Sequence, residues 1–171
     1  MEVKQNNLIE RLKLQPLIVV IRLECDIFNV QKKRNDLFLR IKSLQKFGVK
    51  NIEIGWDSNP EWVNLLLEIK NNFNSINIGV ASISSKQSLN SILSLDLNYS
   101  MSPVFNKELH LKAIGHNQLV IPGISNIENF NEAINLGYKI VKIFPASELG
   151  PNFLNELKKI NKKDIFFIGA G

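Results

Sequence analysis

Apolar residues in this chain form short continuous runs that alternate with longer stretches in which they recur every three or four positions. Residues 17–21, LIVVI, are uninterrupted and of strand length, which is typical of a strand covered on both faces. Similar runs begin near residues 49, 76, 97, 119, 139 and 165. The intervening stretches have helical spacing, and Gly or Pro ends several of them. The pattern predicts seven strands separated by helices.

The helical stretches can be placed from their apolar spacing and from their start and stop signals. We expect a leading helix over residues 6–14, which Pro16 stops, and further helices over residues 28–47, 60–69, 86–95, 106–114, 125–136 and 152–160. Ser125 and Glu128 have the spacing of a capping box at the start of the 125–136 helix.

Strands and helices that alternate with a period of roughly 20 to 30 residues predict a parallel sheet with helices packed on it. A doubly wound sheet usually has a glycine-rich turn after its first strand, and no GxGxxG occurs there. We therefore predict an α/β fold, a (β/α)8 TIM barrel, as a single domain over residues 1–171. Typical barrels need about 250 residues and compact ones about 200. We expect this barrel to be truncated after strand seven, without the eighth strand and its flanking helices.

Composition and charge exclude several classes of protein. Hydrophobic content of 44% and charged content of 22% are ordinary for a globular protein. No apolar run approaches the ~20 residues of a membrane span, and the first residues lack a signal peptide, so we expect a cytoplasmic protein without a membrane partner. The net charge is +5, and its one tight cluster, residues 32–34, fits a solvated helix face better than a nucleic-acid patch.

Metal and disulfide chemistry find little support in the sequence. A single cysteine, Cys25, excludes an internal disulfide framework and a multi-cysteine zinc site, and we expect it to be a small structural residue. His110 and His116 lie in and just after a predicted helix, away from the strand ends, and no carboxylate cluster accompanies them. We expect no metal and no cofactor.

The candidate nucleophile is Lys142, in the run Tyr138–Phe144 that Pro145 closes. Alternation places Ile140, Lys142 and Phe144 on one face of the predicted strand. A lysine buried there loses hydration, so its pKa falls and more free amine exists near neutral pH. A free amine is the nucleophile that Schiff-base chemistry with a ketone needs. The alternative is a lysine at a strand end whose ammonium group extends to solvent.

Polar residues and turn residues stand at the carboxyl ends of the predicted strands, where barrel enzymes place their chemistry. The set consists of Arg22, Glu53, Ser82, Ser102–Pro103, Pro122–Gly123, Lys142 and residues 169–171. A lysine and a carboxylate at one mouth suit a Schiff-base aldolase, with the lysine attacking a keto carbon and Glu53 moving protons. An arginine there can hold a carboxylate or a phosphate.

Each of these side chains also has a purely structural interpretation. Glu53 could pair with a neighbouring lysine, and Arg22 could bridge to Glu24 or Asp26 on the surface. Phe144 could serve barrel packing in place of substrate contact, and Ser82 alone carries little information.

Lys142-Ile143-Phe144-Pro145, preceded by Ile121-Pro122-Gly123, resembles the Schiff-base signature of the bacterial 2-keto-3-deoxy-6-phosphogluconate aldolase family. The segment from Phe144 to Pro151 is similar to the 6-phosphogalactonate branch, and the resemblance extends over essentially the whole chain. It implies a class I aldolase that cleaves a 2-keto-3-deoxy-6-phospho sugar acid to pyruvate and glyceraldehyde 3-phosphate. It also implies a homotrimer that needs no metal.

Carried over by motif, the resemblance gives Lys142 as nucleophile and Glu53 as proton shuttle. The substrate-binding candidates are Arg22, Ser82, Pro103, Phe144 and Gly171, with Gly171 in the phosphate-side loop. Val80 and Asp57 depart from the family pattern, and the missing eighth strand removes half of the expected phosphate loops. The alternative hypothesis is therefore a catalytically weakened homologue that binds a small keto acid or acts as a subunit or scaffold.

Overall fold

The computed structural model describes residues 1–161 and 164–171. Within these residues the strands are β1 (Val19–Ile21), β2 (Asn51–Gly55), β3 (Asn77–Ala81), β4 (Ser100–Met101), β5 (Val120–Ile121), β6 (Gly123–Ile124), β7 (Ile140–Ile143) and β8 (Phe166–Gly169). The helices are α1 (Glu2–Leu14), α2 (Gln31–Lys46), α3 (Trp62–Asn72), α4 (Lys86–Leu93), α5 (Lys107–Gly115), α6 (Ile127–Asn135) and α7 (Ala146–Ile160).

The strands pair in parallel and in chain order, from β1 to β5 and from β6 to β8. β5 and β6 are two halves of one barrel strand, separated by Pro122. The interruption is local, because Pro122 O accepts a hydrogen bond from Lys142 N at 2.9 Å and so continues the ladder to β7. The predicted parallel barrel is confirmed, with β7 and β8 in the places expected for strands six and seven.

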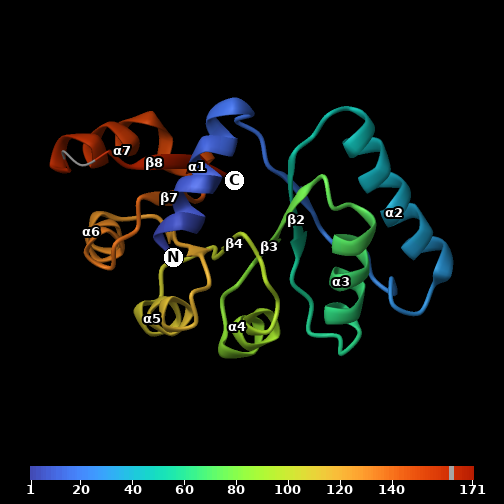
Figure 1. Cartoon of the computed structure of the whole chain (residues 1–171). Coiled ribbons are helices and arrows are strands. Elements are labelled where there is room, and N and C mark those ends of the chain that lie inside the picture. Colours follow the sequence, from blue (N-terminus) through green and yellow to red (C-terminus); the bar gives the residue numbers. More distant parts are fainter. Residues whose placement is uncertain (162–163) are drawn as a thin grey trace.

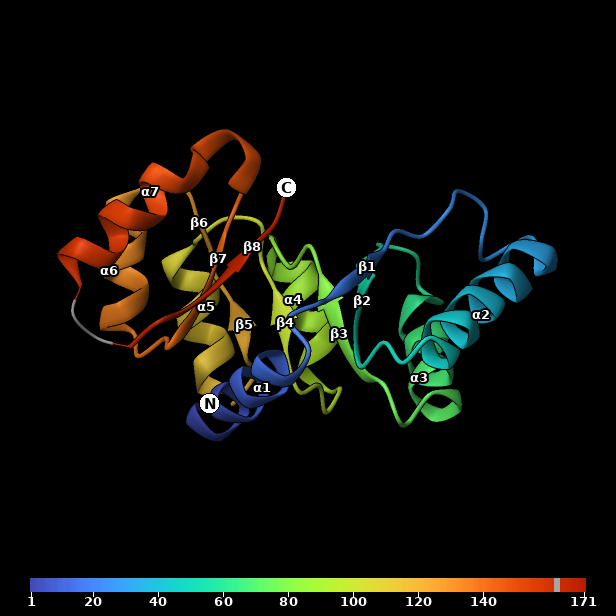
Figure 2. The same cartoon turned by 90° about the horizontal axis from the view of Figure 1, so that it is seen from above.

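The barrel wall is open between β1 and β8. Among the described residues β1 pairs only with β2, and β8 pairs only with β7 (Figure 2). Leu17 and Val20 beside this opening are 48% and 44% exposed, although most apolar strand residues are buried. The opening lies where an eighth strand would complete the wall.

Helix α1 covers the amino-terminal end of the strands, beside the start of β7 (Figure 1). Leu8 and Leu12 bury their side chains in the same core cluster as Tyr138 and Leu119. The buried Gln5 fixes the position of the helix, because its side chain donates to Gly137 O and accepts from Lys139 N. The leading helix thus closes one end of the barrel and leaves the other end for chemistry.

Several local predictions were wrong. Helix α6 is capped by Asn126, whose side-chain oxygen accepts from Asn129 N, and not by Ser125, because the helix begins one residue later than the capping-box spacing predicted. Cys25 is exposed and not a packed structural residue. Helix α7 begins at Ala146, with a break at Gly150, and not at Asn152.

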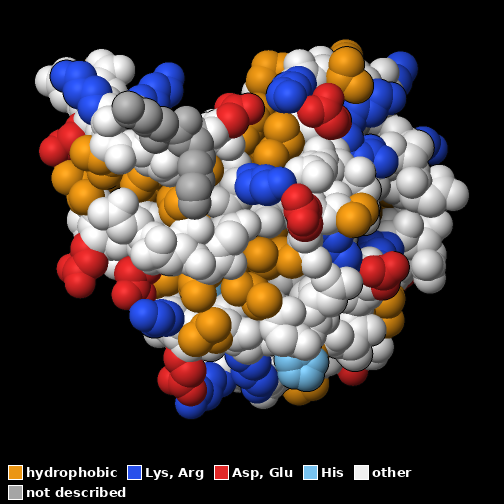
Figure 3. Space-filling view, turned by 60° about the vertical axis from the view of Figure 1, so that its left-hand side comes forward, with side chains coloured by type: hydrophobic (Ala, Val, Ile, Leu, Met, Phe, Trp, Pro, Cys, Tyr) orange, Lys and Arg blue, Asp and Glu red, His pale blue; other side chains and the backbone are white. Residues whose placement is uncertain are grey.

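Surface features agree with the sequence-based expectations about charge. Lysine and arginine side chains alternate with acidic ones on the face that Figure 3 shows, without a broad field of one sign.

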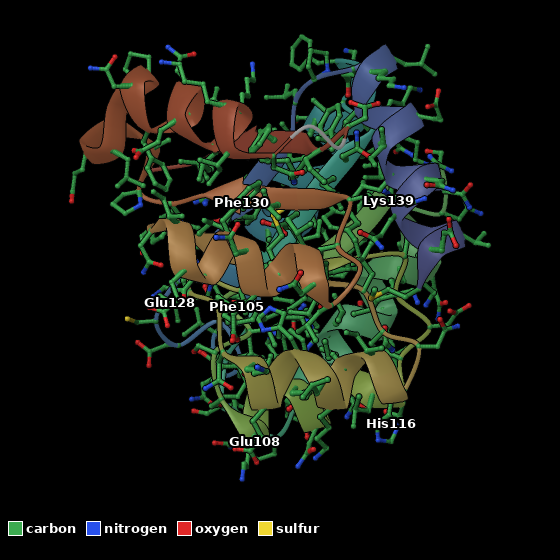
Figure 4. The ribbon with its side chains drawn as sticks, turned by 90° about the vertical axis from the view of Figure 1, so that its left-hand side faces the viewer. Phe105, Glu108, His116, Glu128, Phe130 and Lys139 are labelled. Atoms are coloured by element: carbon green, nitrogen blue, oxygen red, sulfur yellow. The ribbon has the colours of Figure 1, made fainter. Side chains whose placement is uncertain are left out.

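In the described part of the chain no helix is long and apolar enough to cross a membrane. His116 and Glu108 lie on the outer side of α5 (Figure 4), whereas His110 is buried, and this burial lowers its pKa to about 4.

We expect Gly123→Ala to lower the free energy of unfolding by about 3 kcal/mol, because a Cβ at this residue would lie 2.1 Å from Pro103 O in rigid backbone. Urea denaturation measures the change. Gly115→Ala is the matched control, since a Cβ at the end of α5 meets nothing within 4 Å and helix propensity favours Ala by about 1 kcal/mol. Equal losses in the two variants would contradict the assigned contact.

Candidate active site

Glu53 and Lys142 lie on two barrel strands that place both side chains in the interior. Glu53 is near the end of β2, in register with Val20 of β1 and Gly79 of β3. Lys142 is in β7, in register with Gly123 of β6 and Ile168 of β8. Their exposed fractions are 3% and 8%. Both ionisable groups are therefore removed from bulk water, which is rare unless they are paired or functional.

One cavity of about 470 Å³ opens at the carboxyl ends of the strands, a volume in the usual range for a small-molecule site. All of the candidate site residues line it: Arg22, Glu53, Ser82, Pro103, Lys142, Phe144 and Gly171. The structure thus brings these seven candidates together, whereas Ser102, Pro122 and Gly123 of the predicted strand ends do not line the cavity.

The Glu53 carboxyl group is held in a dry environment. Burial raises its pKa from the ordinary 4.5 to about 7, although the nearby positive charges of Lys142 and Arg22 favour the carboxylate. Within the described residues Glu53 Oε1 is buried without a hydrogen-bond partner. A carboxyl group with this pKa can both donate and accept a proton at neutral pH.

The Lys142 amine is perturbed in the complementary direction. Burial lowers its pKa; the negative charge of Glu53 opposes this shift, and Arg22 adds to it. The side chain stays in the cavity wall and does not extend to solvent, so the snorkelling alternative is wrong. Lys142 Nζ lies 5.0 Å from the centroid of the Phe144 ring, which places that ring beside the amine in the cavity wall.

Arg22 faces the cavity and forms no salt bridge within residues 1–161 and 164–171. Its Nη1 donates to Ser82 Oγ at 2.6 Å. The two carboxylates considered as its partners are engaged elsewhere, Glu24 with Arg40 and Asp26 with Lys33. Ser82 has a φ of 69°, an uncommon conformation for a residue other than glycine, and such residues concentrate at functional sites. The pair forms a cationic, hydroxyl-bearing side of the cavity.

Gly171 lies against the start of α7. A Cβ at this residue, whose φ is 138°, would be 3.0 Å from Ala146 N and 3.1 Å from Pro145 Cα. Glycine is therefore required for the backbone to approach the helix so closely. Among the described residues this side of the cavity is formed by the end of a single strand, β8.

Sequence reasoning missed part of the cavity wall. Ile168 faces Lys142 in register, Met101 ends β4, and Leu12 and residues 16–18 line the cavity beside the open edge. These residues carry no chemical signal, and their position depends on strand register and on where α1 packs.

In the described part of the chain no three His, Cys, Asp or Glu side chains gather as possible metal ligands.

Comparison with known proteins places this fold and cavity in a family. The family model for KDPG and KHG aldolase matches residues 8–171. The chain is 24% identical over 125 residues to the 2-dehydro-3-deoxy-6-phosphogalactonate aldolase of Escherichia coli, a match that covers 72% of this chain and 60% of that enzyme. It is 36% identical over 52 residues to the 2-dehydro-3-deoxy-phosphogluconate aldolase of Treponema pallidum, covering 30% of this chain and 25% of that enzyme.

Two solved structures share the fold. The 2-keto-3-deoxy-6-phosphogluconate aldolase of Zymomonas mobilis ZM4 has a TM-score of 0.80 at 17% identity, covering 98% of this chain and 75% of that one. A KDPG aldolase from Legionella pneumophila, with pyruvate captured as a covalent carbinolamine, has a TM-score of 0.77 at 20% identity, covering 91% and 71%. The chain spans 60% of the Escherichia coli enzyme and 25% of the Treponema pallidum enzyme, less than two thirds of either curated relative. The family model nevertheless covers residues 8–171 of this sequence. The chain belongs to the KDPG and KHG aldolase family.

Proposed function

We propose that this protein is a class I aldolase that cleaves a 2-keto-3-deoxy-6-phospho sugar acid, of the gluconate or galactonate type, to pyruvate and glyceraldehyde 3-phosphate. The observation that carries the proposal is the shared cavity of Lys142 and Glu53, whose pKa values are displaced toward neutrality by the same desolvation. The captured carbinolamine in the Legionella relative supports covalent chemistry in the family.

In this mechanism the neutral Lys142 amine attacks the C2 carbonyl and forms a carbinolamine. Protonated Glu53 gives its proton to the departing hydroxyl group, water leaves, and a protonated imine remains. The Glu53 carboxylate then removes the proton of the C4 hydroxyl group. The C3–C4 bond breaks, its electron pair enters the imine to form an enamine, and the aldehyde is released. Protonation at C3 and hydrolysis of the imine release pyruvate and the free amine.

The remaining residues bind and orient the substrate. Arg22, whose hydrogen bond with Ser82 Oγ fixes it at the cavity rim, is suited to hold the carboxylate or the phosphate group. The Phe144 ring beside Lys142 Nζ forms an apolar part of the cavity wall. Pro103 and Gly171 supply backbone surface that limits the size of the substrate.

A second candidate function follows from the open wall between β1 and β8. Among the described residues, the cavity has backbone donors from the end of one strand, β8, on this side, and a cradle built from one strand end holds phosphate less tightly than one built from two. A protein with an intact Lys142 and a weak phosphate site would bind a small keto acid and cleave slowly. Imine formation with pyruvate, together with much slower cleavage of the phosphorylated sugar acid, would distinguish this candidate from the aldolase.

We also propose the homotrimer and the cytoplasmic location that the family resemblance implies. Exposed apolar side chains on the outer helix surface, Phe47 at 83% and Leu39 at 60%, supply contact area for association. Sedimentation equilibrium over a range of concentrations determines the oligomeric state.

Borohydride reduction in the presence of pyruvate is the first test of the nucleophile. We expect one stable adduct per chain, located on Lys142 by peptide mass spectrometry, and its complete loss in Lys142→Ala. Lys139→Ala is the matched control, because Lys139 precedes the same strand but is exposed and paired with Glu2. An adduct that persists in folded Lys142→Ala would remove Lys142 from the mechanism.

The cleavage assay tests the proton shuttle. Glu53→Gln keeps the shape of the side chain but cannot exchange a proton, so we expect kcat to fall by about 10²- to 10⁴-fold with a small change in KM. A kcat within threefold of the parent protein would assign proton transfer to another group.

The stability of the same variant tests the burial of Glu53. Between pH 4.5 and about 7 the folded protein binds a proton at Glu53 that the unfolded chain releases, so this residue lowers stability as pH rises through that window. Relative to the parent protein, we expect Glu53→Gln to gain up to about 3 kcal/mol between pH 4 and pH 8. Urea denaturation at the two pH values measures it, and a difference independent of pH would contradict the raised pKa.

A further inference from the structure

Tyr99 lies beside Glu53 on the inner face of the barrel, although neither the family motif nor the cavity lining includes it. It directly precedes β4, and its side chain is 1% exposed. A Cβ placed on Gly79 would be 2.5 Å from two atoms of the Tyr99 ring. Gly79 is the register partner of Glu53, so its missing side chain would point to the same face. The Tyr99 ring occupies that space.

The Tyr99 hydroxyl group reaches past β3 to β2. It donates a hydrogen bond to Ile52 O at 2.9 Å, the carbonyl group directly before Glu53 in the chain. The bond is buried, and it joins strands that are not neighbours in the sheet. A buried hydrogen bond between otherwise separate strands restricts how β2 can shift at the catalytic carboxyl group.

Three side chains near Glu53 come from different strands, and two of them are cationic. Lys142 from β7 and Arg22 from the end of β1 favour its carboxylate form. On the β4 side stands Tyr99, whose pKa is raised by burial and then by the negative charge of Glu53. The Tyr99 ring over Gly79 and its hydroxyl group at Ile52 O place an apolar ring beside Glu53, whereas Lys142 and Arg22 present cations.

We propose that Tyr99 is a positioning residue for Glu53: its ring excludes water from the inner side of the carboxyl group, and its hydroxyl group fixes β2 at Ile52. This inference rests on the proposed function, in which Glu53 transfers protons. Without the ring, water reaches the carboxyl group and stabilises its charged form, so the pKa of Glu53 falls. Without the hydroxyl group, the carboxyl group stays dry but is less firmly placed.

The titration of Glu53 is the direct test, and it does not depend on aldolase activity. In protein labelled with ¹³C at the glutamate carboxyl carbons, the Glu53 signal is the one that disappears in Glu53→Gln. We expect a midpoint near pH 7 in the parent protein and in Tyr99→Phe, because both keep the ring. In Tyr99→Leu the midpoint is expected to fall by at least one pH unit.

Activity tests the hydroxyl group separately. We expect Tyr99→Phe to lower kcat about three- to tenfold, with KM and the pH midpoint unchanged. Tyr138→Phe is the matched control, because Tyr138 is the other tyrosine of the chain, is equally buried, and has no hydrogen-bond partner for its hydroxyl group among the described residues. It is expected to change neither kcat nor the titration.

The outcomes separate the proposals. A folded Tyr99→Leu with the parent midpoint would show that Tyr99 is ordinary packing. If Tyr99→Leu does not fold, an unchanged kcat in Tyr99→Phe would overturn the inference. If the parent protein forms no adduct on Lys142 and has no cleavage activity, the aldolase proposal fails. The shift of the titration midpoint in Tyr99→Leu then still decides whether the Tyr99 ring keeps Glu53 dry.

Discussion

The arrangement of this protein depends on removing two opposite charges from water inside one barrel. Parallel strands covered by helices provide an interior in which Glu53 and Lys142 are both almost fully buried. Desolvation disfavours the charged form of each, so the carboxyl pKa rises and the amine pKa falls. Their mutual attraction opposes both shifts but does not abolish them. The fold thereby makes Glu53 a proton donor near neutral pH and raises the fraction of free amine at Lys142.

Much of this site could be predicted because its information is local in the sequence. Lys142 stands in a β-branched strand that a proline closes, and the strand period alone places Glu53 and Arg22 at the same barrel mouth. The hydrogen bond between Arg22 and Ser82 could not be predicted, because it joins residues sixty positions apart and depends on the left-handed backbone of Ser82. The same holds for Tyr99 and Gly79, whose contact exists only once the strand register is set. Sequence periodicity determines elements and faces, whereas these pairs depend on the relative placement of distant strands.

The open wall between β1 and β8 divides the cavity into two chemically different sides. On the β2 and β7 side, strands with partners on both edges hold the ionisable groups, so their environment is rigid and dry. On the other side, unpaired edges and exposed apolar residues such as Val20 adjoin the cavity. In the proposed aldolase, imine formation would use the first side, and a terminal phosphate would bind at the second. The proposal therefore assigns imine formation and phosphate binding to different parts of the cavity.

Two glycines make the dry side possible. Glu53 has Gly79 as its register partner, and Lys142 has Gly123. In each case the absent side chain lets another group approach: the Tyr99 ring at Gly79, and the Pro103 backbone at Gly123. A larger residue at Gly79 would displace the Tyr99 ring, and one at Gly123 would displace the Pro103 backbone. Either change would let water reach the charged residue or would strain the backbone. The two glycines thus keep water from Glu53 and Lys142 indirectly, because they leave room for the Tyr99 ring and the Pro103 backbone. A rigid ring or backbone fills that space more completely than a second flexible side chain would. On this argument the glycines are as much a part of the chemistry as the residues they flank.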